Sequence, residues 1–155
     1  MRDQIARRDA AGKPPAPALE RLLGSLLLAD LRFEAAEHHL DRATSLRPDI
    51  ARWWRELAAA RAASGHCEAA IPAYDRALRL DEATAARGAH RTDPLTIART
   101  RLDKARCARA AAQHDLAEAE YRRALKETAD ISSGPPGGEV AVSYTHLTLP
   151  TICSV

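Results

Sequence analysis

Residues 51–84, ARWWRELAAARAASGHCEAAIPAYDRALRLDEAT, set the pattern for the whole chain. The first half places apolar and small residues at helical spacing, Ser64-Gly65 interrupts the pattern, and the second half resumes it. The positions that follow this spacing are Trp54, Leu57, Ala58 and Ala62 before the break, and Ala70, Tyr74, Ala77, Leu78 and Leu80 after it. The stretch therefore predicts two amphipathic helices joined by a tight turn, which is a helical hairpin.

The same pattern occurs 34 residues earlier, where Leu23, Gly24, Ala36, Leu40, Ala43 and Leu46 take the places of Leu57, Ala58, Ala70, Tyr74, Ala77 and Leu80. A period of 34 with small residues at the helix crossings resembles the tetratricopeptide repeat. The resemblance rests on Trp54, Leu57, Ala58, Ala70, Tyr74 and Ala77, and on Leu23, Gly24, Leu27, Ala36, Leu40, Ala43 and Pro48. The sequence departs from the repeat pattern at two positions. The first copy has Glu20 where the pattern has its leading Trp, and the second copy has Arg61 where the pattern has Tyr.

A third copy is predicted after an insertion. Thr92-Asp93-Pro94 is a typical helix start, with a capping side chain followed by proline at the first helical position, and a helix is expected over 94–112. Aligning Cys107 with Gly24 and Ala58 makes the insertion about 15 residues long. Tyr121 and Ala124 then come two residues too early, which turns their helix by roughly 200°. We therefore expect the last helix to pack unlike its counterparts.

The expected architecture is all-α: an α-α superhelix of three hairpins, right-handed by family resemblance. Its parts are a polar, proline-rich leader at 1–17, a repeat domain at 18–130 with repeats at about 17–50, 51–84 and 100–130 and an insertion at 85–99, and a flexible tail at 131–155. Residues 142–155 resemble translated read-through of a sequencing adapter. On that interpretation the natural chain is cut near Ala141 and continues beyond it.

Composition excludes several function classes. The 23 Lys and Arg residues nearly balance 21 Asp and Glu residues, and only 4% of residues are aromatic, so neither nucleic acid nor a membrane surface is an expected partner. The apolar run at 22–29 is too short to span a bilayer, which takes about 20 residues. We expect a soluble, cytoplasmic protein whose partner is a protein or peptide.

Residues that could carry chemistry are few. Cys67 and Cys107 have no C-x-x-C spacing and fall at small or apolar repeat positions, so structural thiols are expected. His38-His39 and His66-Cys67 point to different helix faces, so no metal site is predicted. With no glycine-rich phosphate loop and no nucleophile elbow, we predict a non-catalytic scaffold without a cofactor. The alternative is a regulatory or substrate-recruiting fragment of a larger enzyme, such as a transferase.

The two adjacent tryptophans cannot face the same pocket. Trp54 takes the large leading position of the repeat and is expected to be buried. Trp53 either packs against the end of the preceding helix or serves as an exposed anchor for a ligand.

The resemblance places a peptide-binding groove on the concave face, lined by the first helix of each hairpin. Counting by the repeat, the predicted peptide-binding residues are Arg21, Ser25, Arg52, Arg55, Ala59, Arg101, Lys104 and Ala108. Guanidinium groups bind carboxylates with two parallel hydrogen bonds, so a preference for acidic peptides is expected; the alternative is that these arginines are merely solvated. Ser25 and Glu56 stand where the carboxylate-clamp form of the repeat has asparagines. Weak self-association through an uncapped last helix, with the Tyr121, Ala124 and Leu125 stripe partly exposed, is also predicted.

Overall fold

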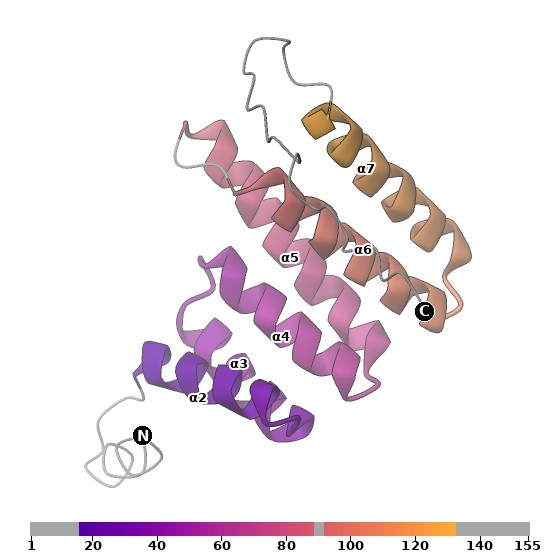
Figure 1. Cartoon of the computed structure of the whole chain (residues 1–155). Coiled ribbons are helices and arrows are strands. Elements are labelled where there is room, and N and C mark those ends of the chain that lie inside the picture. The colour runs from indigo at the N-terminus through magenta and orange to yellow at the C-terminus, as the bar shows by residue number, and fades with distance from the viewer. Residues whose placement is uncertain (1–15, 89–91, 133–155) are drawn as a thin grey trace, which may run out of the picture.

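A computed structural model describes residues 16–88 and 92–132 of the chain (Figure 1). In this part of the chain all regular structure is helical, which confirms the all-α class. The helices are α2 (Pro17–Ala29), α3 (Phe33–Leu46), α4 (Ala51–Ala63), α5 (Cys67–Ala86), α6 (Pro94–Ala110) and α7 (His114–Ser132). Most of the leader and the adapter-like segment at 142–155 lie outside the described residues.

The helices pack as consecutive hairpins, α2 with α3, α4 with α5, and α6 with α7 (Figure 1). Each hairpin then contacts the next mainly through α3 with α4 and α5 with α6. α5 runs on past the repeat to Ala86 and ends before Gly88, which has a φ of 70°. Pro72 is the sixth residue of α5 and does not end the helix, although a proline there removes one intrahelical hydrogen bond.

The turns inside the hairpins define the repeat. Leu31, Gly65 and Ala112 each adopt a left-handed backbone, with φ of 58°, 82° and 57°. In each turn the next residue donates its N–H to a carbonyl five residues back: Arg32 to Leu27, His66 to Arg61 and Gln113 to Ala108. Gly65 follows Leu31 by 34 residues, whereas Ala112 follows Gly65 by 47.

This spacing corrects the expected register of the third hairpin. A shift of 47 places Ala105, not Cys107, at the position of Ala58, and it aligns Ala117, Tyr121 and Ala124 of α7 with their counterparts in α5. The insertion is therefore 13 residues long. The prediction that α7 packs differently is wrong, because one shift of 47 residues fits both α6 and α7 and nothing is deleted from α7.

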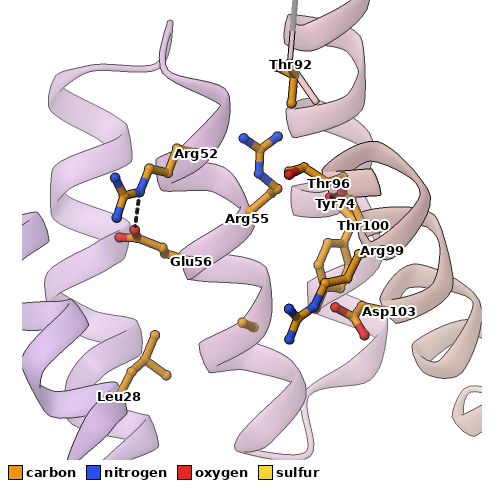
Figure 2. Close-up of a pocket in the computed structure, with 11 residues that line it drawn as sticks. Leu28, Arg52, Arg55, Glu56, Tyr74, Thr92, Thr96, Arg99, Thr100 and Asp103 are labelled. Carbon is orange, nitrogen blue, oxygen red and sulfur yellow. Dashed lines mark hydrogen bonds and ion pairs between the residues drawn. The ribbon is translucent and has the colours of Figure 1, made fainter. Parts of the chain in front are cut away.

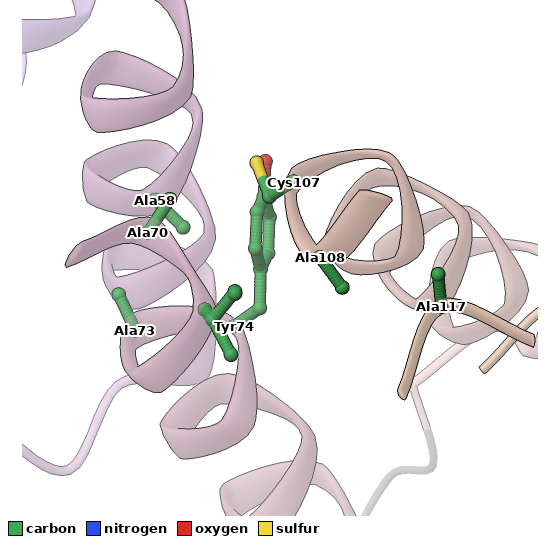
Figure 3. Packing of buried hydrophobic residues seen from close by; sticks show 8 residues of the cluster. Ala58, Ala70, Ala73, Tyr74, Cys107, Ala108 and Ala117 are labelled. Carbon is green, nitrogen blue, oxygen red and sulfur yellow. The ribbon is translucent and has the colours of Figure 1, made fainter. Parts of the chain in front are cut away.

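The core consists of two clusters of buried side chains. One joins the first two hairpins and the other joins the last two: Leu23, Leu27, Ala36, Leu40, Leu57 and Ala60 in the first, and Ala58, Ala70, Ile71, Ala73, Tyr74, Cys107, Ala108 and Ala117 in the second. Figure 3 shows Tyr74 pointing from α5 toward Cys107 of α6, among alanines. Small residues on facing helices let the backbones come close, so one aromatic ring fills the remaining space.

Trp54 packs against both clusters but is only partly buried. Its indole Nε1–H donates to the Pro48 carbonyl at 3.0 Å, in the turn between the first two hairpins. The polar edge of the ring thus stays at the surface, which is why Trp54 is less buried than expected. Trp53 is half-buried rather than fully exposed.

No helix among the described residues combines the length and the hydropathy that crossing a lipid bilayer requires.

Candidate peptide-binding groove

A groove of about 550 Å³ runs between α4 and α6, with Tyr74 of α5 at its floor (Figure 2). A second hollow of about 400 Å³ continues it and shares Ala59, Tyr74 and Asp103 with it. We call the two hollows together the groove. Its walls are Leu28 from α2, Arg52, Arg55, Glu56, Ala59, Ala62 and Ala63 from α4, Tyr74 and Cys67 from α5, and Thr92, Thr96, Arg99, Thr100, Asp103, Arg106 and Cys107 from α6 and the residues before it.

Helical spacing explains which side chains meet in the groove. On α4 the lining residues recur at intervals of three and four, from Arg52 to Ala63, and on α6 they do the same from Thr96 to Arg106. Residues at such intervals share one face of a helix. The two faces oppose each other because α4 and α6 both pack against α5.

Glu56 organises the charges on the α2–α4 side of the groove. Its carboxylate accepts from Arg21 Nη1 at 3.1 Å, from Ser25 Oγ at 2.8 Å and from Arg52 Nε at 2.9 Å. Arg21 and Ser25 are therefore held by an acidic residue of the neighbouring helix. Arg52 still leaves 69% of its side chain exposed, so its guanidinium remains accessible to a ligand.

Arg55 is fixed more firmly. Its Nη1 donates to Asp81 of α5 at 2.5 Å, and the Thr92 hydroxyl donates to the other oxygen of the same carboxylate at 2.6 Å. Asp81 is buried. Asp81 of α5 thus links Arg55 of α4 to Thr92, which precedes α6 by two residues. These contacts hold Arg55 against the wall of the groove.

The α6 wall carries two exposed guanidiniums. Arg106 forms an ion pair with Asp103 at 3.0 Å, an exposed contact between neighbouring turns that stabilises little. Arg99 is exposed, and none of the described residues forms an ion pair with it. Arg52, Arg99 and Arg106 are thus the accessible cations of the groove.

The structure brings only part of the predicted site together. Arg52, Arg55 and Ala59 line the groove, and Arg21 and Ser25 contact its residue Glu56. In contrast, Arg101, Lys104 and Ala108 lie inside the third hairpin, where Lys104 is 4% exposed and Ala108 is fully buried. They do not line the groove, because the assumed register was displaced by two residues.

Inside that hairpin Lys104 and Arg101 surround Glu120. Lys104 Nζ lies 2.9 Å from Glu120 and 2.6 Å from Asp75 of α5. Arg101 donates to Glu120 at 3.2 Å and to Glu127 at 2.7 Å. Burial alone would raise the pKa of Glu120, but the hydrogen bonds and charges of Lys104 and Arg101 hold this pKa below its ordinary value. These ion pairs hold Lys104 and Arg101 against α7 and α5.

Sequence reasoning missed Thr96, Arg99, Thr100, Asp103 and Arg106. A signal for two of them is the position of Tyr121 and Ala124, which follow Tyr74 and Ala77 by 47 residues: the same shift from Arg52 and Ala59 gives Arg99 and Arg106. Applied to α6, the same shift moves the lining positions onto the face that the structure exposes.

Among the described residues no three His, Cys, Asp or Glu side chains gather as a metal site would require.

Solved structures with the same fold are tetratricopeptide repeat proteins, as the sequence resemblance predicted. The N-terminal domain of stress-induced protein-1 (STI-1) from C. elegans superposes with a TM-score of 0.62 at 21% identity, covering 72% of this chain and 83% of that domain. MamA superposes with a TM-score of 0.61 at 19% identity, covering 76% of this chain, and BtubC from P. vanneervenii with a TM-score of 0.64 at 20% identity, covering 79%. The chain spans 61% of the MamA chain and 50% of the BtubC chain. No family model and no curated protein matches the sequence.

Proposed function

We propose that this protein is a non-catalytic scaffold whose groove binds an extended, acidic segment of a partner protein. The observation that carries the proposal is a groove with small side chains on α4 that is lined by two exposed arginines, Arg52 on α4 and Arg99 on α6, the latter without an ion-pair partner in the part of the chain that the structure describes. A segment lying between them would meet cations on both walls.

The shape of the groove supports an extended ligand. Ala59, Ala62 and Ala63 present only methyl groups along α4, so the backbone of a ligand can come close. Thr92, Thr96 and Thr100 add hydroxyl groups on the opposite side. Their protons are already donated to Asp81, to Asp93 and to the Thr96 carbonyl, so these oxygens can only accept from N–H groups of a ligand, whereas guanidinium groups can bind a carboxylate in two places.

The charges favour an acidic ligand over a basic one. The acidic residues of the groove, Glu56 and Asp103, are already paired with Arg21, Arg52 and Arg106. A basic peptide would have to compete for them, whereas an acidic peptide meets Arg99 and the exposed part of Arg52. Because these charges are near solvent, affinity should fall as salt is added.

The test compares acidic and basic peptide pools by fluorescence anisotropy at low and moderate salt. The double variant Arg52→Glu/Arg99→Glu should lose the preference for the acidic pool, with at least tenfold weaker binding. Arg76→Glu/Arg79→Glu is the matched control: it changes the net charge equally on exposed positions of α5 that do not line the groove. Equal affinity of the parent for both pools, or equal losses in the two variants, would contradict the proposal.

A further inference from the structure

Cys67 and Cys107 are distant in sequence but line the same part of the groove. Cys67 is the first residue of α5, and Cys107 lies in the second half of α6. Both border the hollow of about 400 Å³, together with the small side chains of Ala59, Ala62 and Ala63. Both are free thiols. The fold therefore places two thiols beside one open cavity.

The two thiols differ in how a reagent can reach them. Cys107 is 3% exposed, whereas Cys67 is partly exposed. Burial, together with a hydrogen bond and the charge interaction with the neighbouring Cys67 thiol, raises the pKa of Cys107 to about 12. Cys107 is therefore protonated at neutral pH, and a reagent entering from solvent meets Cys67 first.

We propose that Cys67 and Cys107 form a redox-active dithiol, an oxidation site at which low-molecular-weight disulfides introduce an intramolecular disulfide bond. The Cys67 thiolate attacks one sulfur of the small disulfide, whose sulfur–sulfur bond breaks, and a small thiolate leaves. That thiolate takes the Cys107 proton. The Cys107 thiolate then attacks Cys67 Sγ in the mixed disulfide and releases the second small thiolate, which takes up the proton that Cys67 had lost.

The balance is that two protein thiols are oxidised to one disulfide while one small disulfide is reduced to two thiols. The bond would join the start of α5 to α6, next to Tyr74 and Ala59 of the groove floor. Figure 3 shows Cys107 at this junction, beside Tyr74. Closing the long loop between the two cysteines restricts the unfolded chain, so the oxidised protein should melt at a higher temperature.

The experiment uses the full chain carrying Cys153→Ser, since Cys153 lies outside the described residues and would add a third thiol. The reduced protein is treated with oxidised glutathione at neutral pH. The expected product is a monomer that has lost two hydrogen atoms, with a Cys67–Cys107 cross-linked peptide after digestion. Its higher melting temperature should revert on reduction.

Two further variants follow the order of attack. In Cys107→Ala a glutathione adduct should accumulate on Cys67, because no second thiol resolves it. In Cys67→Ala the buried Cys107 should stay unmodified. Circular dichroism checks that both variants fold. If one variant does not fold, the presence or absence of the Cys67–Cys107 cross-link in the parent tests the proposal. Thiols that stay reduced, adducts without a cross-link in the parent, or cross-links between molecules would overturn the proposal.

Discussion

The leading position of each hairpin is filled in a different way, and a residue 19 positions later complements it. Trp54 is matched by the small Ala73, buried Glu20 by His39, whose Nδ1 lies 2.8 Å away, and Arg101 by Glu120. A buried charge needs a partner of opposite sign, which Arg42 supplies to Glu20 at 3.2 Å, whereas an aromatic ring needs space. The absence of tryptophan from the first hairpin is therefore compensated by a polar contact.

Gly24 shows how tightly the first hairpin packs. A Cβ at this position would lie 2.5 Å from Leu40 Cγ and 3.3 Å from the Ala36 carbonyl oxygen. Gly24→Ala should therefore lower the free energy of unfolding by up to about 2 kcal/mol, because overpacking costs about 1–3 kcal/mol and helix propensity offsets about 1 kcal/mol of that. Urea denaturation measures the difference.

Leu40→Ala provides the control for Gly24→Ala, since it removes the side chain that the new methyl group meets. In that background Gly24→Ala should be neutral or stabilising. A Gly24→Ala protein that is more stable than the parent would mean that helix propensity, not contact with Leu40, decides the residue at this position.

At the scale of the helices, the third hairpin differs from the others in having a charged interior. The equivalents of Leu57 and Trp54 are Lys104 and Arg101, and both interact with fully buried Glu120. Removing one member of a buried ion pair leaves the other uncompensated, which costs about 3–5 kcal/mol. If Glu120 is neutralised, Lys104 keeps its ion pair with Asp75 and Arg101 keeps its ion pair with Glu127. The stability lost at Glu120 should therefore lie at the low end of this range.

Glu120→Gln should therefore lower the free energy of unfolding by about 3 kcal/mol at neutral pH. The folded-state pKa of Glu120 lies below its unfolded value. Its contribution is therefore fully present above about pH 4.3 and is lost as the pH falls through the folded-state value. Urea midpoints measured from neutral to acid pH should show the variant approaching the parent only in acid. Glu118→Gln, on the exposed side of α7, should change the free energy of unfolding little. A difference in stability between Glu120→Gln and the parent that stays the same at every pH would contradict this account.

Helix existence and most helix boundaries could be predicted from the sequence, because periodicity, Pro48, Gly65 and the Asp93-Pro94 start are local signals. The register of the third hairpin could not be fixed by matching Cys107 alone, since alanine, cysteine and glycine all fit a crossing position. The left-handed turns fix it, but Leu31 and Ala112 are not residues that signal a positive φ, unlike Gly65. Accordingly, the residues expected on α4 line the hollow that the structure contains, whereas Lys104 and Ala108 of α6 are buried in the third hairpin.

At the scale of the whole molecule, each helix relies mainly on its neighbours in sequence, so the ends of the described array have fewer partners than its middle. Leu22 and Leu26 of α2 and Leu125 of α7 are exposed. The expected stripe on α7 is only partly open: Ala124 is buried and Tyr121 half-buried, while Leu125 is 67% exposed. Leu125 is thus the residue through which self-association at α7 can be tested.

We expect the full chain to associate weakly with itself through α7, because burying an exposed leucine against a second copy removes apolar surface from water. The average mass from light scattering should rise with protein concentration, and Leu125→Glu should keep it at the monomer value by placing a charge in the contact. Leu95→Glu changes an equally apolar, exposed leucine at the start of α6 and should leave association unchanged. A parent that stays monomeric at every concentration, or a Leu125→Glu variant that associates as the parent does, would show that α7 is not the surface of self-association.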